Sequence, residues 1–123
     1  MATETELMAM GIPWGPARAL GSNINTSVVA AGASQATATV LAADYNILTT
    51  AAAAGVQLPS PVGMSDVIIM NVSGNTQNVY PPVGLILYQG SNVAVNTAYA
   101  LANNKMLACF PVGNAWFGIL SGI

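Results

Sequence analysis

The sequence predicts an all-β fold, an antiparallel β-sandwich or jelly roll with an extended N-terminal arm. Short runs rich in Val, Ile, Thr and Tyr recur along the 123 residues, and Gly, Asn, Pro and Ser separate them. Several runs alternate apolar and polar residues, which is the period of a strand. No stretch sustains the i, i+3, i+4, i+7 apolar spacing of an amphipathic helix.

The first strands follow residue 25. Residues 26–31 and 35–41 are strand candidates with a Gly-Ala-Ser turn between them, and residues 46–50 form a third. The four alanines at 51–54 are too few to hold a helix in water. Residues 56–58 form another short strand that ends at a proline, which cannot donate a ladder hydrogen bond.

The segment at residues 68–80 predicts a hairpin. Gly74 and Asn75 suit a two-residue turn, which would place Asn71 opposite Asn78. Alternation then assigns two faces to the hairpin. The predicted core face holds Ile68, Met70, Val72 and Val79, and the opposite face holds Ile69, Asn71, Asn78 and Tyr80. The second face is polar without charge, so we expect Asn71, Asn78 and Tyr80 to bond to another protein or to water.

The last strands are predicted at residues 85–88, 93–97, 105–110 and 116–120. A turn at residues 113–114 would place Phe110 opposite Phe117 and Pro111 opposite Trp116. Such cross-strand pairs stabilise a sheet. The number and spacing of short strands are typical of a sandwich or jelly roll.

Charged residues are scarce in this sequence. They make up 5% of the chain, against about 25% in an ordinary soluble domain. Apolar residues make up 54%, which argues against disorder, and polar interruptions argue against spanning helices. Interface cores are depleted in charge. We therefore expect neighbouring subunits to cover much of the surface, in a homo-oligomer such as a dimer or trimer; drift in composition is the alternative.

Residues 1–24 differ from the β domain predicted at 25–123. They hold two of the four acids, one of the two bases and a Pro-Trp-Gly-Pro segment. Leu7, Met10 and Trp14 give this part apolar anchors. We expect an arm that lies across a neighbouring subunit, and a disordered leader is the alternative.

Catalytic chemistry has little support. The chain contains no His, which removes the commonest general base and zinc ligand. Cys109 lacks an imidazole partner and lies in a predicted strand, while Asp44 and Asp66 suit turns. Asp44 and Asn46 alone are a poor start for a calcium site. We expect that the protein is not an enzyme and that it binds no metal or cofactor.

Net charge and basic residues bear on partners and location. The formal charge is −2 and only Arg18 and Lys105 are basic, so phosphate contacts to nucleic acid are not expected. The N-terminus carries acids where a secretory signal would be basic. We expect synthesis in a cytoplasm without export, and no membrane partner.

Several motifs resemble small virion proteins of tailed bacteriophages. They are Gln-Ala-x-Ala-Thr at 35–39, Gly-Val-Gln-Leu-Pro at 55–59, Asn-Val-Tyr-Pro-Pro-x-Gly at 78–84 and Gly-Asn-x-Trp at 113–116. The resemblance is to capsid decoration (cement) proteins and to fibre or spike modules. It implies a non-enzymatic protein on the capsid surface whose partner is the major capsid protein or another virion protein. The alternative is a tail or fibre module that binds a host glycan or receptor.

Overall fold

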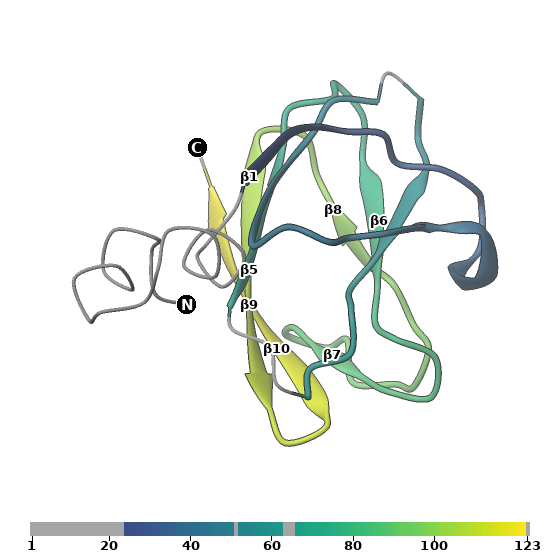
Figure 1. Ribbon diagram of the computed structural model, residues 1–123, viewed down its shortest axis with the longest axis vertical. Helices are drawn as coiled ribbons and strands as arrows, with labels where there is room; N and C mark the ends of the chain where they lie inside the picture. Colours follow the sequence, from purple (N-terminus) through teal and green to yellow (C-terminus); the bar gives the residue numbers. More distant parts are fainter. Residues whose placement is uncertain (1–23, 51, 63–65, 123) are drawn as a thin grey trace, which may run out of the picture.

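The computed structural model describes residues 24–50, 52–62 and 66–122, and within them the regular structure is almost entirely β (Figure 1). One short 3-10 helix, η1 (Gln35–Thr37), is the exception. The predicted all-β class is confirmed. Apart from Ile24, the predicted arm lies outside the described residues.

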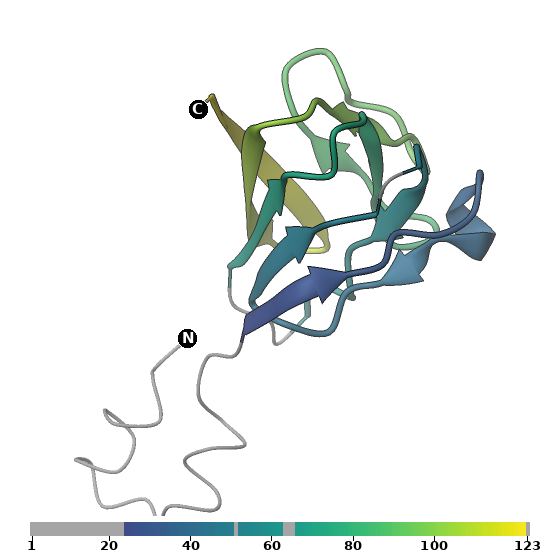
Figure 2. The same cartoon turned by 90° about the horizontal axis from the view of Figure 1, so that it is seen from above.

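In the described residues, ten strands form two sheets. They are β1 (Ile24–Val28), β2 (Thr39–Val40), β3 (Tyr45–Leu48), β4 (Gly55–Gln57), β5 (Val67–Asn71), β6 (Gln77–Tyr80), β7 (Leu87–Tyr88), β8 (Tyr99–Leu101), β9 (Lys105–Val112) and β10 (Ala115–Gly122). The larger sheet has the order β1-β3-β5-β9-β10-β7, and the smaller has the order β2-β4-β6-β8. The view from above shows the two sheets on opposite sides of the domain (Figure 2).

The chain changes sheet at every step from β1 to β9. Because β1, β3 and β5 lie side by side and run the same way, as do β2, β4 and β6, their pairings are parallel. Of the eight strand pairings described, five are parallel and three are antiparallel. The predicted antiparallel arrangement is therefore wrong. Between β1, β3 and β5, and between β2, β4 and β6, the chain crosses to the other sheet and returns in the same direction.

The hairpin predicted at residues 68–80 is also wrong. β5 pairs with β3 and β9 in the larger sheet, whereas β6 pairs with β4 and β8 in the smaller one. Gly74 does adopt a positive φ of 88°, but the turn leads across the domain rather than back along β5. The predicted faces of β5 are reversed as a result: Ile69 and Asn71 are buried, and Ile68 and Met70 are half-buried on the other side. The assignment of Val79 to the core is confirmed.

The hairpin predicted at residues 113–114 is confirmed. β9 and β10 pair antiparallel, with Phe110 opposite Phe117 and Pro111 opposite Trp116. Gly113 supplies a φ of 61°, a left-handed conformation that glycine adopts without steric cost.

The core lies between the two sheets. Trp116 is its largest fully buried side chain, and its indole Nε1 donates a hydrogen bond of 2.8 Å to the carbonyl of Pro59. This bond satisfies the polar end of an otherwise apolar side chain. The cluster around it consists of Val28, Ala30, Leu41, Leu48, Val56, Leu58, Val67, Ile69, Val79, Leu87, Leu101, Leu107 and Cys109.

Two buried amides hold the crossover from β5 to β6. Asn71 Nδ2 donates to the carbonyls of Asn75 (2.7 Å) and Leu101 (2.9 Å), and Asn71 Oδ1 accepts from the backbone and hydroxyl of Ser73. Gln77 Nε2 donates to the carbonyl of Ala52 at 2.9 Å and to Ser73 Oγ at 2.9 Å. A buried backbone group left without a partner is costly, so these amides replace the ladder bonds that the crossover lacks.

Replacing Asn71 by Ala is expected to lower the free energy of unfolding by about 2–4 kcal/mol, because several buried backbone groups lose their partners. The matched change Asn78→Ala, at a half-buried position on β6, is expected to cost less than about 1 kcal/mol. Urea unfolding monitored by circular dichroism measures both values. Equal losses would contradict the role given to Asn71.

Candidate functional site

The side of the larger sheet that points away from the core is the candidate site, and we call it the outer face. Residues paired across neighbouring strands point to the same side of a sheet, so the register assigns its members. They form three rows: Ile24, Tyr45, Ile68, Ala108 and Ile119; Ile47, Met70, Met106 and Ser121; and Phe110, Phe117 and Tyr88. Five of the six strands contribute to the longest row.

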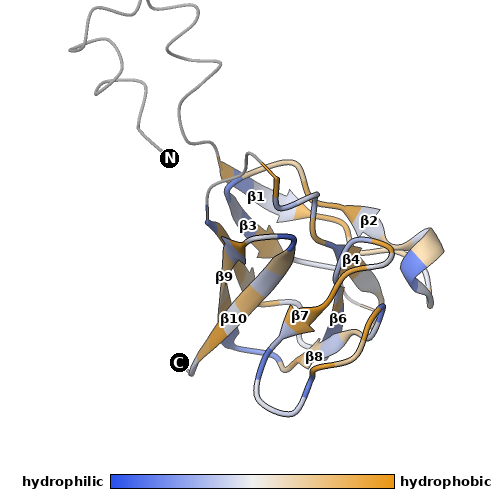
Figure 3. Cartoon of the chain, turned by 90° about the horizontal axis from the view of Figure 1, so that it is seen from below, coloured by the Kyte–Doolittle hydropathy of each residue, from blue (hydrophilic) through white to orange (hydrophobic). Residues whose placement is uncertain are grey.

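Among the residues that the register assigns to the outer face, none is charged, and Ser121 is the one outside the apolar and aromatic classes. Ile24 is 61% exposed, Ile119 is 60% exposed and Phe117 is 45% exposed. The rings of Tyr88 and Phe117 lie 5.0 Å apart at 48°. Figure 3 shows hydrophobic colours on β7, β9 and β10, with paler residues between them on β9 and β10. Exposed apolar surfaces of this kind are typical of sites that bind proteins, membranes or ligands.

The sequence of β5 explains why the larger sheet is apolar on both sides. Residues 67–70 read Val-Ile-Ile-Met without alternation. Val67 and Ile69 enter the core, whereas Ile68 and Met70 take the outer face. Unbroken apolar runs are typical of strands that are covered on both faces. The sequence prediction missed the outer face, and this run was the signal that pointed to it.

The smaller sheet presents a different outward side. Register places Asn78 beside Gly55, and Tyr80 beside Gln57. The ring of Tyr80 covers Gly55 so closely that a Cβ there would lie 2.9 Å from Tyr80 Cε2. Amides and a phenol therefore make this side more polar than the outer face.

The predicted interface residues separate into three groups. Asn71 is fully buried between the sheets, so its predicted placement on an exposed face is wrong; its amide is used by the crossover. Asn78 and Tyr80 are half-buried on the outward side of the smaller sheet, two residues apart on β6. The predicted positions Leu7, Met10 and Trp14 lie outside the described residues.

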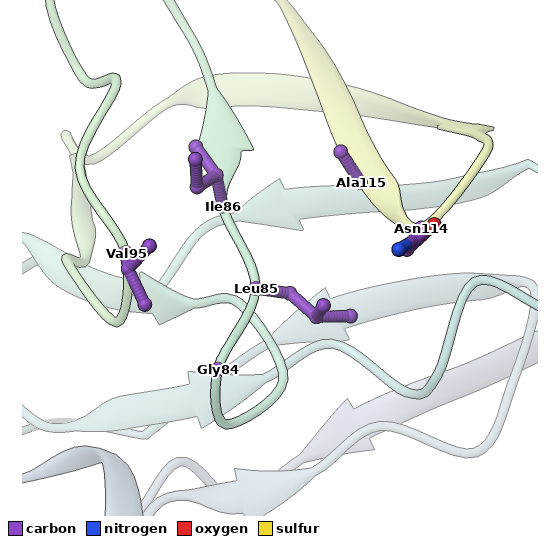
Figure 4. A pocket seen from close by; sticks show the side chains of 6 residues that line it. All are labelled: Gly84, Leu85, Ile86, Val95, Asn114 and Ala115. Atoms are coloured by element: carbon purple, nitrogen blue, oxygen red, sulfur yellow. The ribbon is translucent and has the colours of Figure 1, made fainter.

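A shallow pocket of about 280 Å³ lies between the loop before β7 and the β9–β10 turn (Figure 4). Its lining consists of Gly84, Leu85, Ile86, Val95, Asn114 and Ala115. None of these residues is ionisable or aromatic. The pocket therefore offers space for an apolar side chain, without an acid–base group or a ring on which a sugar would stack.

Candidate catalytic groups are not assembled. Cys109 is fully buried, and burial raises the pKa of its thiol, which keeps it protonated and unreactive at neutral pH. Asp44 is buried near the start of β3, whereas Asp66 is exposed just before β5. Within residues 24–50, 52–62 and 66–122, no group of three or more His, Cys, Asp and Glu side chains is placed to hold a metal ion.

Comparison with known proteins adds no relative. No family model, curated protein or solved structure matches the chain.

In the part of the chain that the structure describes, no helix has the length and apolar character needed to cross a bilayer.

The buried thiol of Cys109 is expected to make the stability of the protein depend on pH. The folded protein holds the Cys109 proton more tightly than the unfolded chain does, because burial raises the pKa only in the folded state. The contribution of the thiol to the free energy of unfolding is fully present below the ordinary thiol pKa of about 8.5. It declines as the pH rises above that value. From about pH 8.5 to 9.5 the parent protein should lose about 1 kcal/mol more unfolding free energy than Cys109→Ala.

Urea unfolding of both proteins across this pH range measures the difference. All other groups are common to both proteins, so their contribution cancels in the comparison. Parallel pH profiles would contradict a buried, protonated thiol.

Proposed function

We propose that the protein is a non-enzymatic structural protein of a phage virion that binds and stabilises the capsid, as decoration or cement proteins do. The outer face is the observation that carries this proposal. It is apolar, free of charge and built on a paired sheet, so it offers a rigid surface to a protein partner. The sequence motifs at residues 35–39, 55–59, 78–84 and 113–116 add the resemblance to virion proteins.

In this proposal the partner is the major capsid protein or another virion protein. Burial of apolar surface contributes about 25 cal/mol per Å², and an uncharged face loses no ion hydration when it is covered. Ile119 and Phe117 are the best-placed anchors because both are exposed on β10. Further copies of the chain, as a dimer or trimer, and the arm at residues 1–24 would add contacts to neighbouring subunits.

The two sheets with a common core favour a β-sandwich with mixed strand directions as the finer description of the fold. A sandwich of this kind presents two outward sides. We place the shell contact on the apolar one and leave Asn78 and Tyr80, on the more polar one, as candidates for a second contact.

A tail or fibre module that binds a host glycan is the second candidate function. Four aromatic side chains of the outer face favour it, since rings can stack on sugars; they are Tyr45, Tyr88, Phe110 and Phe117. Copy number separates the two functions. Hundreds of copies over the head indicate decoration, and a few copies at the tail indicate adhesion.

Placing a charge on the outer face tests capsid binding. Ile119→Lys is expected to weaken attachment to purified capsids at least tenfold, because an unpaired charge would be buried in the contact. Val83→Lys is the matched control, since Val83 is 70% exposed in a loop outside the face. Copies retained per particle after sedimentation measure attachment, and circular dichroism checks that both variants fold.

Equal attachment of the two variants would contradict a shell contact through the outer face. The variant Asn78→Lys, measured in the same way, reports whether the smaller sheet contributes a second contact. Loss with Asn78→Lys and none with Ile119→Lys would move the contact to the smaller sheet.

A further inference from the structure

The outer face needs a cover before the protein meets any partner. Its exposed apolar side chains, among them Ile24, Tyr45, Phe117 and Ile119, would otherwise promote aggregation of the free chain. The described residues carry few charges that would oppose such aggregation: Asp44, Asp66 and Lys105. Of these, Asp44 is buried.

We propose that, in the free protein, residues 7–14 of the chain lie across the outer face of the same molecule. This goes beyond the proposed function, because it concerns the protein before assembly and holds for any partner of the face. When a partner binds the outer face, the segment is displaced and can contact a neighbouring subunit.

The position of Ile24 supports this assignment. Ile24 is the first residue of β1, an edge strand of the larger sheet, and the first member of the longest apolar row, so the chain enters the domain at one end of that row. From there the row crosses β3, β5 and β9 to Ile119 on β10, four strand spacings or about 19 Å away. Residues 15–23 span up to about 30 Å when extended. The segment at 7–14 can therefore reach every part of the row.

The composition of residues 7–14 matches the surface. They read Leu-Met-Ala-Met-Gly-Ile-Pro-Trp, which contains no charge. Methionine side chains adapt to irregular apolar surfaces, and a tryptophan adds a large contact area. Eight extended residues measure about 26 Å, close to the width of about 24 Å that six strands give the sheet. Glu4 and Glu6 lie beyond this segment and can stay in water.

A second copy of the domain is a poorer cover. A second copy must be captured from solution, and it loses translational and rotational freedom when it binds. A segment tethered at Ile24 instead faces its own sheet at a millimolar effective concentration. The same segment of another molecule reaches that concentration only in an assembly.

Trp14 provides a direct probe, because the other tryptophan, Trp116, is fully buried in the core. Subtracting the emission of Trp14→Phe from that of the parent protein gives the Trp14 signal. If Trp14 lies on the outer face, its emission is blue-shifted and acrylamide quenches it at least threefold less than in a peptide of residues 1–23. The signal should not change over a hundredfold dilution.

Variants of the face complete the test. Ile119→Lys is expected to return Trp14 quenching to the peptide value, and Val83→Lys is expected to leave it unchanged. Peptide-like quenching in the parent protein would overturn the proposal, and so would equal effects of the two lysine variants. Loss of protection on dilution would overturn it in favour of exchange between copies. Because no capsid is present, these outcomes do not depend on whether the protein decorates one.

Discussion

A β-sheet has two faces, and in this protein both faces of the larger sheet are apolar. Val67, Ile69 and Leu107 turn inward and build the core with the smaller sheet. Ile68, Met70 and Ile119 turn outward, where Ile68 and Met70 are half-buried and Ile119 is exposed. An apolar outward face of this kind is typical of sheets that a further segment or another protein covers. The candidate site and the proposed role in a virion both rest on this outward face.

The uncharged polar residues have a different use. The chain passes between the sheets at almost every step, and each passage interrupts the ladder of backbone hydrogen bonds. Asn71 and Gln77 satisfy these backbone groups from inside the domain, and Asn92 does so near β7 by donating 2.7 Å to the carbonyl of Leu87. Neutral amides do this without the desolvation cost of a buried carboxylate. Many of the Asn and Gln side chains thus form hydrogen bonds to the connecting segments rather than to solvent.

Local patterns in the sequence determined what could be predicted. The all-β class follows from short runs with polar punctuation, and the β9–β10 turn needs only its glycine and its immediate neighbours. The partners of β5 and β6 could not be predicted in the same way, because both strands take neighbours from distant segments. Once β5 lies between β3 and β9, Asn71 must point inward. The predicted exposure of Asn71 was therefore wrong because of tertiary strand pairing, although an asparagine suits either a buried or an exposed position.

The outer face was hard to predict for a related reason. The apolar run Val67–Met70 predicts a strand that is buried on both faces. The sequence alone does not show that the described domain packs against only one of these faces. Register across five strands shows this, because it gathers scattered residues such as Tyr45, Phe110 and Ile119 on one side.

An image of the intact particle, at a resolution that places individual strands, tests the central claim most directly. The account predicts that the outer face of the larger sheet lies against another virion protein, with β9 and β10 inside the contact. A particle in which this face is open to solvent, or one in which the protein is absent, would contradict it.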